Sequence, residues 1–273
     1  MADRSDHVAH FVGRVQQVFR PEIPESFWDC EDALADLLKK PFLADALNRE
    51  LANVAQDATQ TRNWLGSELV LHRGGGFALS ISIFDKPQRY IHSLPYHAMH
   101  AGVGGFGLRC NVYELPPSFR NHVFDPTVRL SSAGVRKAEP REILCLPSGK
   151  QAYDFIYEQP TPVLKFVTAA IQPLEWLFTR QALQAWQAND ADLSFTQLRV
   201  AADVAGRFAH QSSLQPLKRL AQHTHYAVRW TAIQNLARLS RSEAIEHLRA
   251  AVNDPHPHVQ RAARKTLEKL TAK

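Results

Sequence analysis

The chain has little cysteine. Its 273 residues include only Cys30, Cys110 and Cys145, which lie far apart and show no CxxC spacing. Three thiols cannot all pair within one chain, and cysteine zinc sites are built from closely spaced pairs. The sequence therefore predicts neither a disulfide framework nor a cysteine zinc site, and we expect the three thiols to be small buried residues.

Long apolar runs and the common hydrolase motifs are also missing. No window approaches the ~18 uninterrupted apolar residues that predict a membrane span. The N-terminus, MADRSDHVAHFVGRV, is mixed in charge and lacks an apolar region followed by a cleavage site, so we expect no signal peptide and a cytoplasmic protein. Neither HExxH nor a nucleophile elbow occurs, so hydrolytic chemistry has no support in the sequence.

What is present is an ordinary globular composition with an uneven charge. Hydrophobic residues make up 45% and charged residues 22% of the chain, and its length suits two domains. Residues 195–273 hold 13 Lys and Arg against 5 Asp and Glu, whereas the residues before them hold 19 against 22. The formal charge of +5 therefore comes from the C-terminal part.

Helical periodicity marks the N-terminal part. Residues 8–19, 27–39 and 42–57 carry apolar side chains at three- and four-residue spacing, separated by prolines. Ser26 is predicted to cap the second helix, because its hydroxyl can accept a hydrogen bond from an unpaired amide of the first turn. We predict an N-terminal helical section over residues 1–63.

From about Trp64 the apolar spacing changes to alternation. In residues 77–84 the apolar Leu79, Ile81 and Ile83 alternate with serines, as in a half-buried strand. Gly74-Gly75-Gly76 precedes this run and is predicted to form a hairpin turn. Further strand-like runs are residues 108–113, 127–131, 141–146, 152–157 and 162–168. Short strands at such close spacing predict an antiparallel sandwich or barrel over residues 64–172.

After Gln172 we predict helices to the end, residues 173–273, built as an internal repeat. Residues 214–239 and 245–270 superimpose at an offset of 31, and residues 198–202 match 228–232 at an offset of 30. Self-similarity at this period predicts helix pairs that bury their apolar faces against neighbouring pairs.

The last copy, AIEHLRAAVNDPHPHVQRAARKTLEKL, resembles a HEAT repeat. It has an apolar helix, a turn with Asp254 and Pro255, and a second helix that opens Val-x-x-Ala-Ala. The resemblance covers roughly residues 195–270 and implies a curved surface for a macromolecular partner, either another protein or a second copy of the chain. The alternative is a stabilising helical cap.

The middle segment resembles a degenerate cupin. Cupins carry His-x-His, then Glu and Gly, and later Pro-x-Gly followed by His. Here His92 stands at the first histidine and Leu94 at the second, and His100 lies near the glutamate position, with Gly107 closing the motif. Residues 147–149, Pro-Ser-Gly, match the second motif, but Ala152 stands at the last histidine.

This resemblance implies a barrel that binds a small molecule. A divalent metal such as Fe(II) would be held by His92 and His100, with His97 as a third ligand. If the protein is an enzyme, the resemblance implies a non-haem metal-dependent oxygenase, an oxidoreductase. Arg109 could then pair with a substrate carboxylate through its forked donors, and Tyr113 could line the pocket.

We therefore predict an α+β protein with N-terminal helices, a cupin-like antiparallel β-barrel and a C-terminal HEAT-like α-solenoid. The leading hypothesis is a small-molecule-binding protein with a partner-binding tail. The alternative is a non-enzymatic protein–protein interaction scaffold, which the missing histidines at Leu94 and Ala152 favour. A third hypothesis, nucleic-acid binding through the basic tail, ranks lower. No membrane partner is expected.

Overall fold

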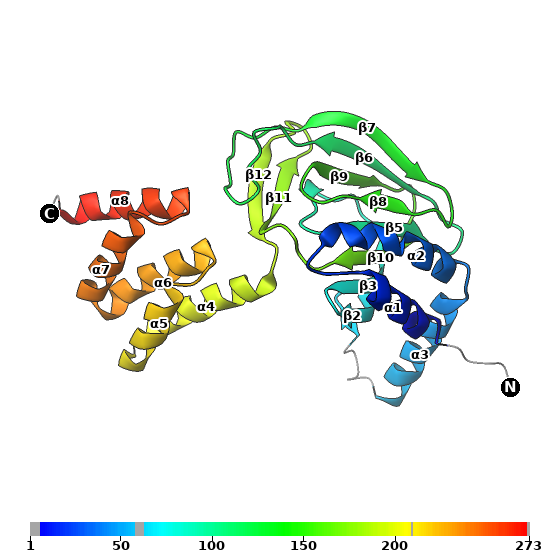
Figure 1. Ribbon diagram of the computed structural model, residues 1–273, viewed down its shortest axis with the longest axis horizontal. Coiled ribbons are helices and arrows are strands. Elements are labelled where there is room, and N and C mark those ends of the chain that lie inside the picture. The colour runs from blue at the N-terminus through cyan, green and yellow to red at the C-terminus, as the bar shows by residue number, and fades with distance from the viewer. Residues whose placement is uncertain (1–5, 58–62, 209, 272–273) are drawn as a thin grey trace. The chain divides into compact units, whose positions relative to one another are not determined.

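The computed structural model describes residues 6–57, 63–208 and 210–271 (Figure 1). The chain divides into two compact units, Met1–Asn189 and Asp190–Lys273, which are described in turn. Within the described residues no helix is long and apolar enough to cross a membrane.

The N-terminal unit begins with helices, as predicted. They are α1 (His7–Val18), the 3₁₀ helix η1 (Pro24–Cys30), α2 (Glu31–Leu38) and α3 (Phe42–Gln56). The Asp6 side chain caps α1 by accepting a hydrogen bond from the amide of Ala9. The predicted capping role of Ser26 is wrong, because η1 precedes α2 and contains this serine. The hydroxyl of Ser26 instead accepts from the Arg20 amide and donates to the Ile23 carbonyl.

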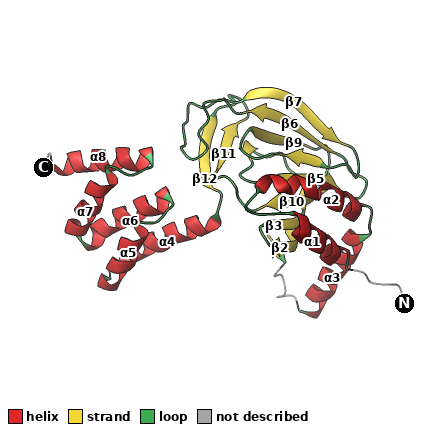
Figure 2. Ribbon diagram, in the orientation of Figure 1, coloured by secondary structure: helices red, strands yellow, loops and turns green. Residues whose placement is uncertain are grey.

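In the described parts of the chain the strands form two six-stranded antiparallel sheets (Figure 2). In sheet order the first contains β1 (Trp64–Leu65), β2 (Glu68–Gly74), β3 (Phe77–Phe84), β10 (Thr161–Thr168), β5 (Ala98–Gly102) and β8 (Leu144–Leu146). The second contains β12 (Ala185–Asp190), β11 (Leu174–Thr179), β4 (Tyr90–Ser93), β9 (Gln151–Ile156), β6 (Leu108–Glu114) and β7 (Ser131–Ala138). The predicted α+β class with an antiparallel β domain is confirmed.

The first sheet turns one face toward the N-terminal helices. Leu79, Met99 and Phe166 on β3, β5 and β10 are buried in one core with Phe11 and Phe27 of the helical section. Phe166 contacts both rings, with centroids 5.2 Å from Phe11 and 4.5 Å from Phe27. The helices and the first sheet therefore share a single core.

The second sheet is covered on one face by the segment between β6 and β7. Trp176 and Phe178 of β11 are buried in a core with Leu130, and Phe119 and Phe124 of this segment pack on Trp176. The indole nitrogen of Trp176 donates to the carbonyl of Asn121. This cover identifies the outer face of the second sheet.

Strand predictions hold best where alternation is regular. The predicted strand 77–84 coincides with β3, and the glycine turn joins β2 to it with Gly75 and Gly76 in the left-handed region. The predicted strand 127–131 is wrong, because the Thr127 amide and hydroxyl both bond the Asp125 carboxylate in a turn. The strand there, β7, starts at Ser131.

The prediction of helix from Gln172 onward is also wrong. Residues 174–190 form β11 and β12, and helical structure begins at Leu193. In β11 the buried Leu174, Trp176 and Phe178 alternate with Glu175 and the less buried Leu177, which is a two-residue period.

The C-terminal unit is helical, as predicted. Its elements are α4 (Leu193–Phe208), the 3₁₀ turn η2 (Gln211–Ser213), α5 (Leu214–Leu220), α6 (Tyr226–Leu239), α7 (Arg241–Ala251) and α8 (Pro257–Thr271). The repeat-matched Leu217, Ala232 and Leu248 share one buried core with Ala202 of α4. At Gly206 a side chain would overlap Asn235, so this glycine permits the close approach of α4 to α6.

Candidate functional site

The side chains that face the space between the two sheets are fixed by strand register. Directly opposed residues on neighbouring strands share one face of a sheet. Lys165 lies opposite Ser80 and His100, and Glu68 lies opposite Ser82. These residues alternate with those that pack on the helices, so their side chains belong to the inner face of the first sheet.

Two of these inner residues form an ion pair. The Lys165 Nζ lies 2.7 Å from Glu68 Oε2, and the two side chains are 19% and 24% exposed, so solvent reaches both. Burial alone would raise the pKa of Glu68, but hydrogen bonds from Lys165 and Ser80 lower it below its ordinary value. Glu68 is therefore held in its ionised form.

A second pair lies on the inner face of the other sheet. His92 is opposite Tyr153, which is buried in the core between the sheets, and Nδ1 of His92 lies 2.8 Å from Glu175 Oε1. The pKa of Tyr96 is raised by burial and then by the carboxylates of Glu175 and Glu68. By strand register, the two pairs lie on the inner faces of opposite sheets.

His100 lies deeper, on the inner face of the first sheet opposite Lys165. It is 3% exposed, and in the described residues neither ring nitrogen has a hydrogen-bond partner. Its ring packs against Phe155 and Phe84, with centroids 5.4 and 6.3 Å away. Burial, with a smaller contribution from the Lys165 ammonium, lowers its pKa to about 3, so the imidazole is neutral at physiological pH.

His97, the third predicted ligand, lies elsewhere. Its ring packs on Trp28 at 4.8 Å and on Phe27 at 6.4 Å, on the side of the first sheet that faces the helices. Its Nδ1 accepts a hydrogen bond from the amide of Ser148, and the Ser148 hydroxyl donates to the carbonyl of Leu94. The two segments that carry the cupin resemblance therefore meet, but His97 joins them as a structural residue.

These placements do not fit the predicted three-histidine metal centre. His92 and His100 face the interior, whereas the lone pair of His97 is engaged by Ser148 on the other side of the sheet. In the described ranges, residues 6–57, 63–208 and 210–271, no three His, Cys, Asp or Glu side chains come close enough together to hold a metal ion.

The predicted catalytic pair lies on the outer face of the second sheet. Arg109 and Tyr113 alternate with Leu108, Cys110 and Val112, which are buried in the core between the sheets. Tyr113 packs in the outer core. Arg109 is exposed beside a hollow of about 330 Å³ at the ends of strands from both sheets, which Phe84 and Phe155 also line. Because Arg109 and Tyr113 belong to the outer strand face, neither side chain points into the core between the sheets.

An aromatic pair belongs to the inner face near one edge of the second sheet. Tyr90 lies two residues before His92 on β4 and so shares its face. Trp186 of β12 is 59% exposed and stacks beside Tyr90, with centroids 6.4 Å apart and ring planes within 11°. Arg89 lies over the Tyr90 ring at 5.5 Å. The edge therefore presents flat aromatic surface to solvent.

Of the four residues in these two pairs, sequence reasoning found His92 and missed Glu68, Lys165 and Glu175. Lys165 interrupts the apolar run of β10, Pro-Val-Leu-Lys-Phe-Val-Thr, and a charge inside such a run was the signal that could have revealed it. Glu68 and Glu175 carried no comparable signal, because only the strand register assigns them to the inner face.

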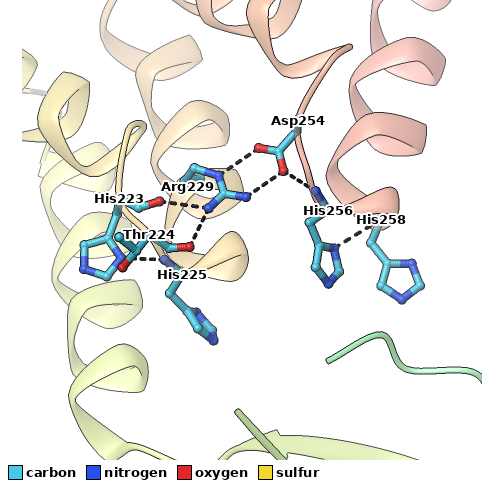
Figure 3. Close-up of polar contacts among 7 residues, drawn as sticks. All are labelled: His223, Thr224, His225, Arg229, Asp254, His256 and His258. Atoms are coloured by element: carbon cyan, nitrogen blue, oxygen red, sulfur yellow. Dashed lines mark hydrogen bonds and ion pairs between the residues drawn. The ribbon is translucent and has the colours of Figure 1, made fainter. Parts of the chain in front are cut away.

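The repeats contain a second polar cluster (Figure 3), which serves the fold. Arg229 at the start of α6 donates to both carboxylate oxygens of Asp254, at 2.8 and 2.6 Å, and also to the carbonyls of His223 and Thr224. The side chains of Arg229 and Asp254 are 11% and 6% exposed. Asp254 further accepts from the amide of His256, so this cluster joins two successive turns.

The comparison with family models decides the nature of this unit. Residues 187–270 match the family of HEAT repeats. The C-terminal unit consists of HEAT repeats. The predicted resemblance of this region is thereby confirmed, and the match extends a few residues before the predicted start at about residue 195. No curated protein matches the sequence.

The N-terminal unit is distantly similar to solved structures. A hydroquinone 1,2-dioxygenase from Sphingomonas sp. TTNP3, with 4-hydroxybenzoate bound, is 14% identical, and the match covers 40% of this chain and 69% of that chain with a TM-score of 0.32. The DMSP lyase DddQ from Ruegeria pomeroyi DSS-3 is 13% identical, and the match covers 62% and 94% with a TM-score of 0.29.

Proposed function

We propose that the β domain binds a small, neutral, polyhydroxylated molecule, such as a sugar, between its two sheets. The observation that carries the proposal is the set of four charged or ionisable side chains on the inner strand faces, two from each sheet. Each is between 19% and 29% exposed, so each is partly buried and still reachable from solvent. The four are Glu68, His92, Lys165 and Glu175.

Such groups are unfavourable in the interior of a β sandwich. Charged groups lose hydration there, and their mutual attraction repays this only partly, so apolar residues would stabilise the fold as well or better. The neighbouring inner residues Ala98, Val163 and Phe155 show that the same space also accepts apolar side chains. Retained polar groups in a partly open interior are therefore best explained by a ligand.

The pairing of the charges favours a neutral ligand. Lys165 already neutralises Glu68, and Nδ1 of His92 lies 2.8 Å from the Glu175 carboxylate. An ionic ligand would displace one partner and leave a charge unmatched, which is costly at low exposure. Hydroxyl groups can instead donate to the carboxylates and accept from Lys165 and Tyr96 without breaking either pair.

The aromatic edge favours a ring. Tyr90 and Trp186 stand on the inner face beside His92, and Trp186 is more than half exposed. Aromatic faces combine apolar contact area with little loss of side-chain freedom, which suits the flat face of a sugar. We assign no reaction to this site, and the predicted oxygenase lacks its third histidine ligand here.

The test is ligand-observed NMR on the full chain with D-glucose, D-galactose, D-mannose and D-ribose. We expect at least one of them to show saturation transfer that is lost in Trp186→Ala. Trp64→Ala is the matched control, because Trp64 is also exposed, at 39%, but lies on β1 of the other sheet. No transfer from any of the four, or equal loss in both variants, would contradict the proposal.

The HEAT repeats are proposed to bind a protein partner. Solenoid proteins usually bind their partners through the exposed surface of their repeats. The basic face of α8, with Arg261, Lys265 and Lys269 exposed at four-residue spacing, also keeps the nucleic-acid alternative open to test. Binding to duplex DNA that falls steeply between low and physiological salt would favour that alternative.

A further inference from the structure

Helix α4 carries an apolar stripe on its solvent side. Leu193, Val200, Val204 and Phe208 are 69%, 58%, 44% and 81% exposed. At 100° per residue these four positions fall within an arc of about 80°, which also contains the exposed polar Gln197 between Leu193 and Val200. The buried Ala202 and Gly206 lie on the opposite side, so the stripe faces away from the repeat core.

The repeats themselves show that this face does not need to be apolar. With the offsets of 30 and 31 residues, Val204 and Phe208 of α4 correspond to exposed polar residues in both later copies. The corresponding residues are Gln234 and Arg238 in α6, and Lys265 and Lys269 in α8. At Val204 and Phe208 the apolar character is therefore specific to α4, whereas Val200 corresponds to Trp230, which packs against the repeat core.

The stripe is self-complementary about its midpoint. In an antiparallel pair of α4 helices centred between Val200 and Ala201, Leu193 of one copy meets Phe208 of the other, and the two Val200 side chains lie together at the centre. Leu193 and Phe208, the two most exposed apolar side chains of the stripe, thus meet at both ends of the helix pair. The contact would extend along about 24 Å, the length of a 16-residue helix.

The charges beside the stripe fit the same arrangement. Asp192, at the N-terminus of α4, is exposed and accepts from the amide of Ser194. Arg207 near the C-terminus is 68% exposed and pairs with Asp203 one turn earlier, with Nε 2.8 Å from the carboxylate. Both lie on the same side of the stripe, and antiparallel pairing brings the start of one helix beside the end of the other. Asp192 of each copy then lies beside Arg207 of the other, and the helix dipoles oppose.

We propose that α4 is a homodimer surface, through which a second copy of this chain covers the stripe in antiparallel, two-fold pairing. This proposal goes beyond the ligand site and does not depend on it. It replaces an unidentified protein partner by a second copy of the chain, and it predicts which residues meet.

The first test is sedimentation equilibrium of the full chain over a concentration series. We expect a reversible monomer–dimer equilibrium, a dissociation constant at least tenfold higher in Val204→Glu, and an unchanged constant in Val135→Glu. Val135 is the matched control, because it is an exposed valine, 46%, on β7. A monomer at every concentration, or a dimer that Val204→Glu does not weaken, overturns the proposal.

The second test concerns the geometry. Val200→Cys should give a covalent dimer on mild oxidation, because the two positions adjoin across the two-fold axis. Gln234→Cys, at an exposed site on α6, should give no more than the parent, whose own cysteines set the background. Equal cross-linking in the two variants would overturn the antiparallel pairing centred on Val200.

Discussion

At the scale of single residues, His100 is the clearest case of a polar group confined by its surroundings. It is buried against Phe84 and Phe155 without a partner for either ring nitrogen in the described residues. Its pKa is lowered from 6.5 to about 3, chiefly by burial. The unfolded chain therefore binds a proton over this interval while the folded chain does not, and stability falls as the pH falls from 6.5 toward 3.

His100→Leu should remove this contribution. Between pH 7 and pH 4 the parent should lose stability faster than the variant, by up to about 1.4 kcal/mol per pH unit for one proton. Urea midpoints at several pH values measure the difference. His10→Leu removes an exposed imidazole in α1 and is the control. Parallel pH profiles of the parent and His100→Leu would contradict the assignment.

In the HEAT repeats the clearest case of a buried charged side chain is Arg229. It makes a nearly buried ion pair with Asp254 and also bonds two carbonyls of the preceding turn. Arg229→Ala should destabilise the HEAT repeats by about 3–5 kcal/mol, because the Asp254 carboxylate is left uncompensated. Arg238→Ala, on the same helix but with a 47% exposed side chain, should change the unfolding curve little. Equal effects would mean that the buried pair has no special role.

At the scale of helices and strands, Gly206 sets the distance between α4 and α6. Gly206→Ala should destabilise the C-terminal unit by about 1–3 kcal/mol, although alanine is the better helix former, because the new methyl group overlaps Asn235. Gly13→Ala in α1 meets nothing within 4 Å and should stabilise its unit by about 0.5–1 kcal/mol. Denaturant unfolding followed by circular dichroism measures both, and a stabilising Gly206→Ala would refute the close contact.

The helices and strands differ in how well they could be predicted from the sequence. The strand over residues 77–84 and the repeat over residues 214–270 have strong, regular apolar periods, and both predictions are confirmed. The tail after Gln172 was predicted as helix although Leu174, Trp176 and Phe178 alternate, because three positions are too few to outweigh a helical neighbourhood. Short strands such as β5, buried on both faces, show no alternation at all.

The candidate site was predicted only in part. His92 and His100 face the interior as expected, because two segments of the cupin-like pattern meet in space. Arg109 and Tyr113 were assigned to the interior, but strand parity puts them on the outer face. Alternation divides the side chains of β6 into two sets, but it does not say which set faces the interior. In β6 this is decided by the opposite sheet and by the covering segment, which the local sequence does not encode.

At the scale of the whole molecule, the histidine placement predicts a protein that does not hold a stoichiometric metal through the three predicted ligands. Elemental mass spectrometry of untagged chain, after incubation with Fe(II) under nitrogen and desalting, should give well below one ion per chain. His92→Ala and His97→Ala should leave the value unchanged. Near-stoichiometric iron that both variants abolish would restore the three-histidine centre.

At the same scale, a neutral sugar-like ligand bound between the sheets would contact the Lys165–Glu68 and His92–Glu175 pairs. The most direct measurement is isothermal titration with the monosaccharide that gives the strongest NMR transfer, on four variants of the full chain. Lys165→Met and Glu175→Gln change the inner face, and Arg109→Ala and Tyr113→Phe change the outer face. The account predicts that the dissociation constant rises at least tenfold in the first two and stays at the parent value in the others. Unaltered binding in the inner-face variants, or equal loss in all four, would contradict it.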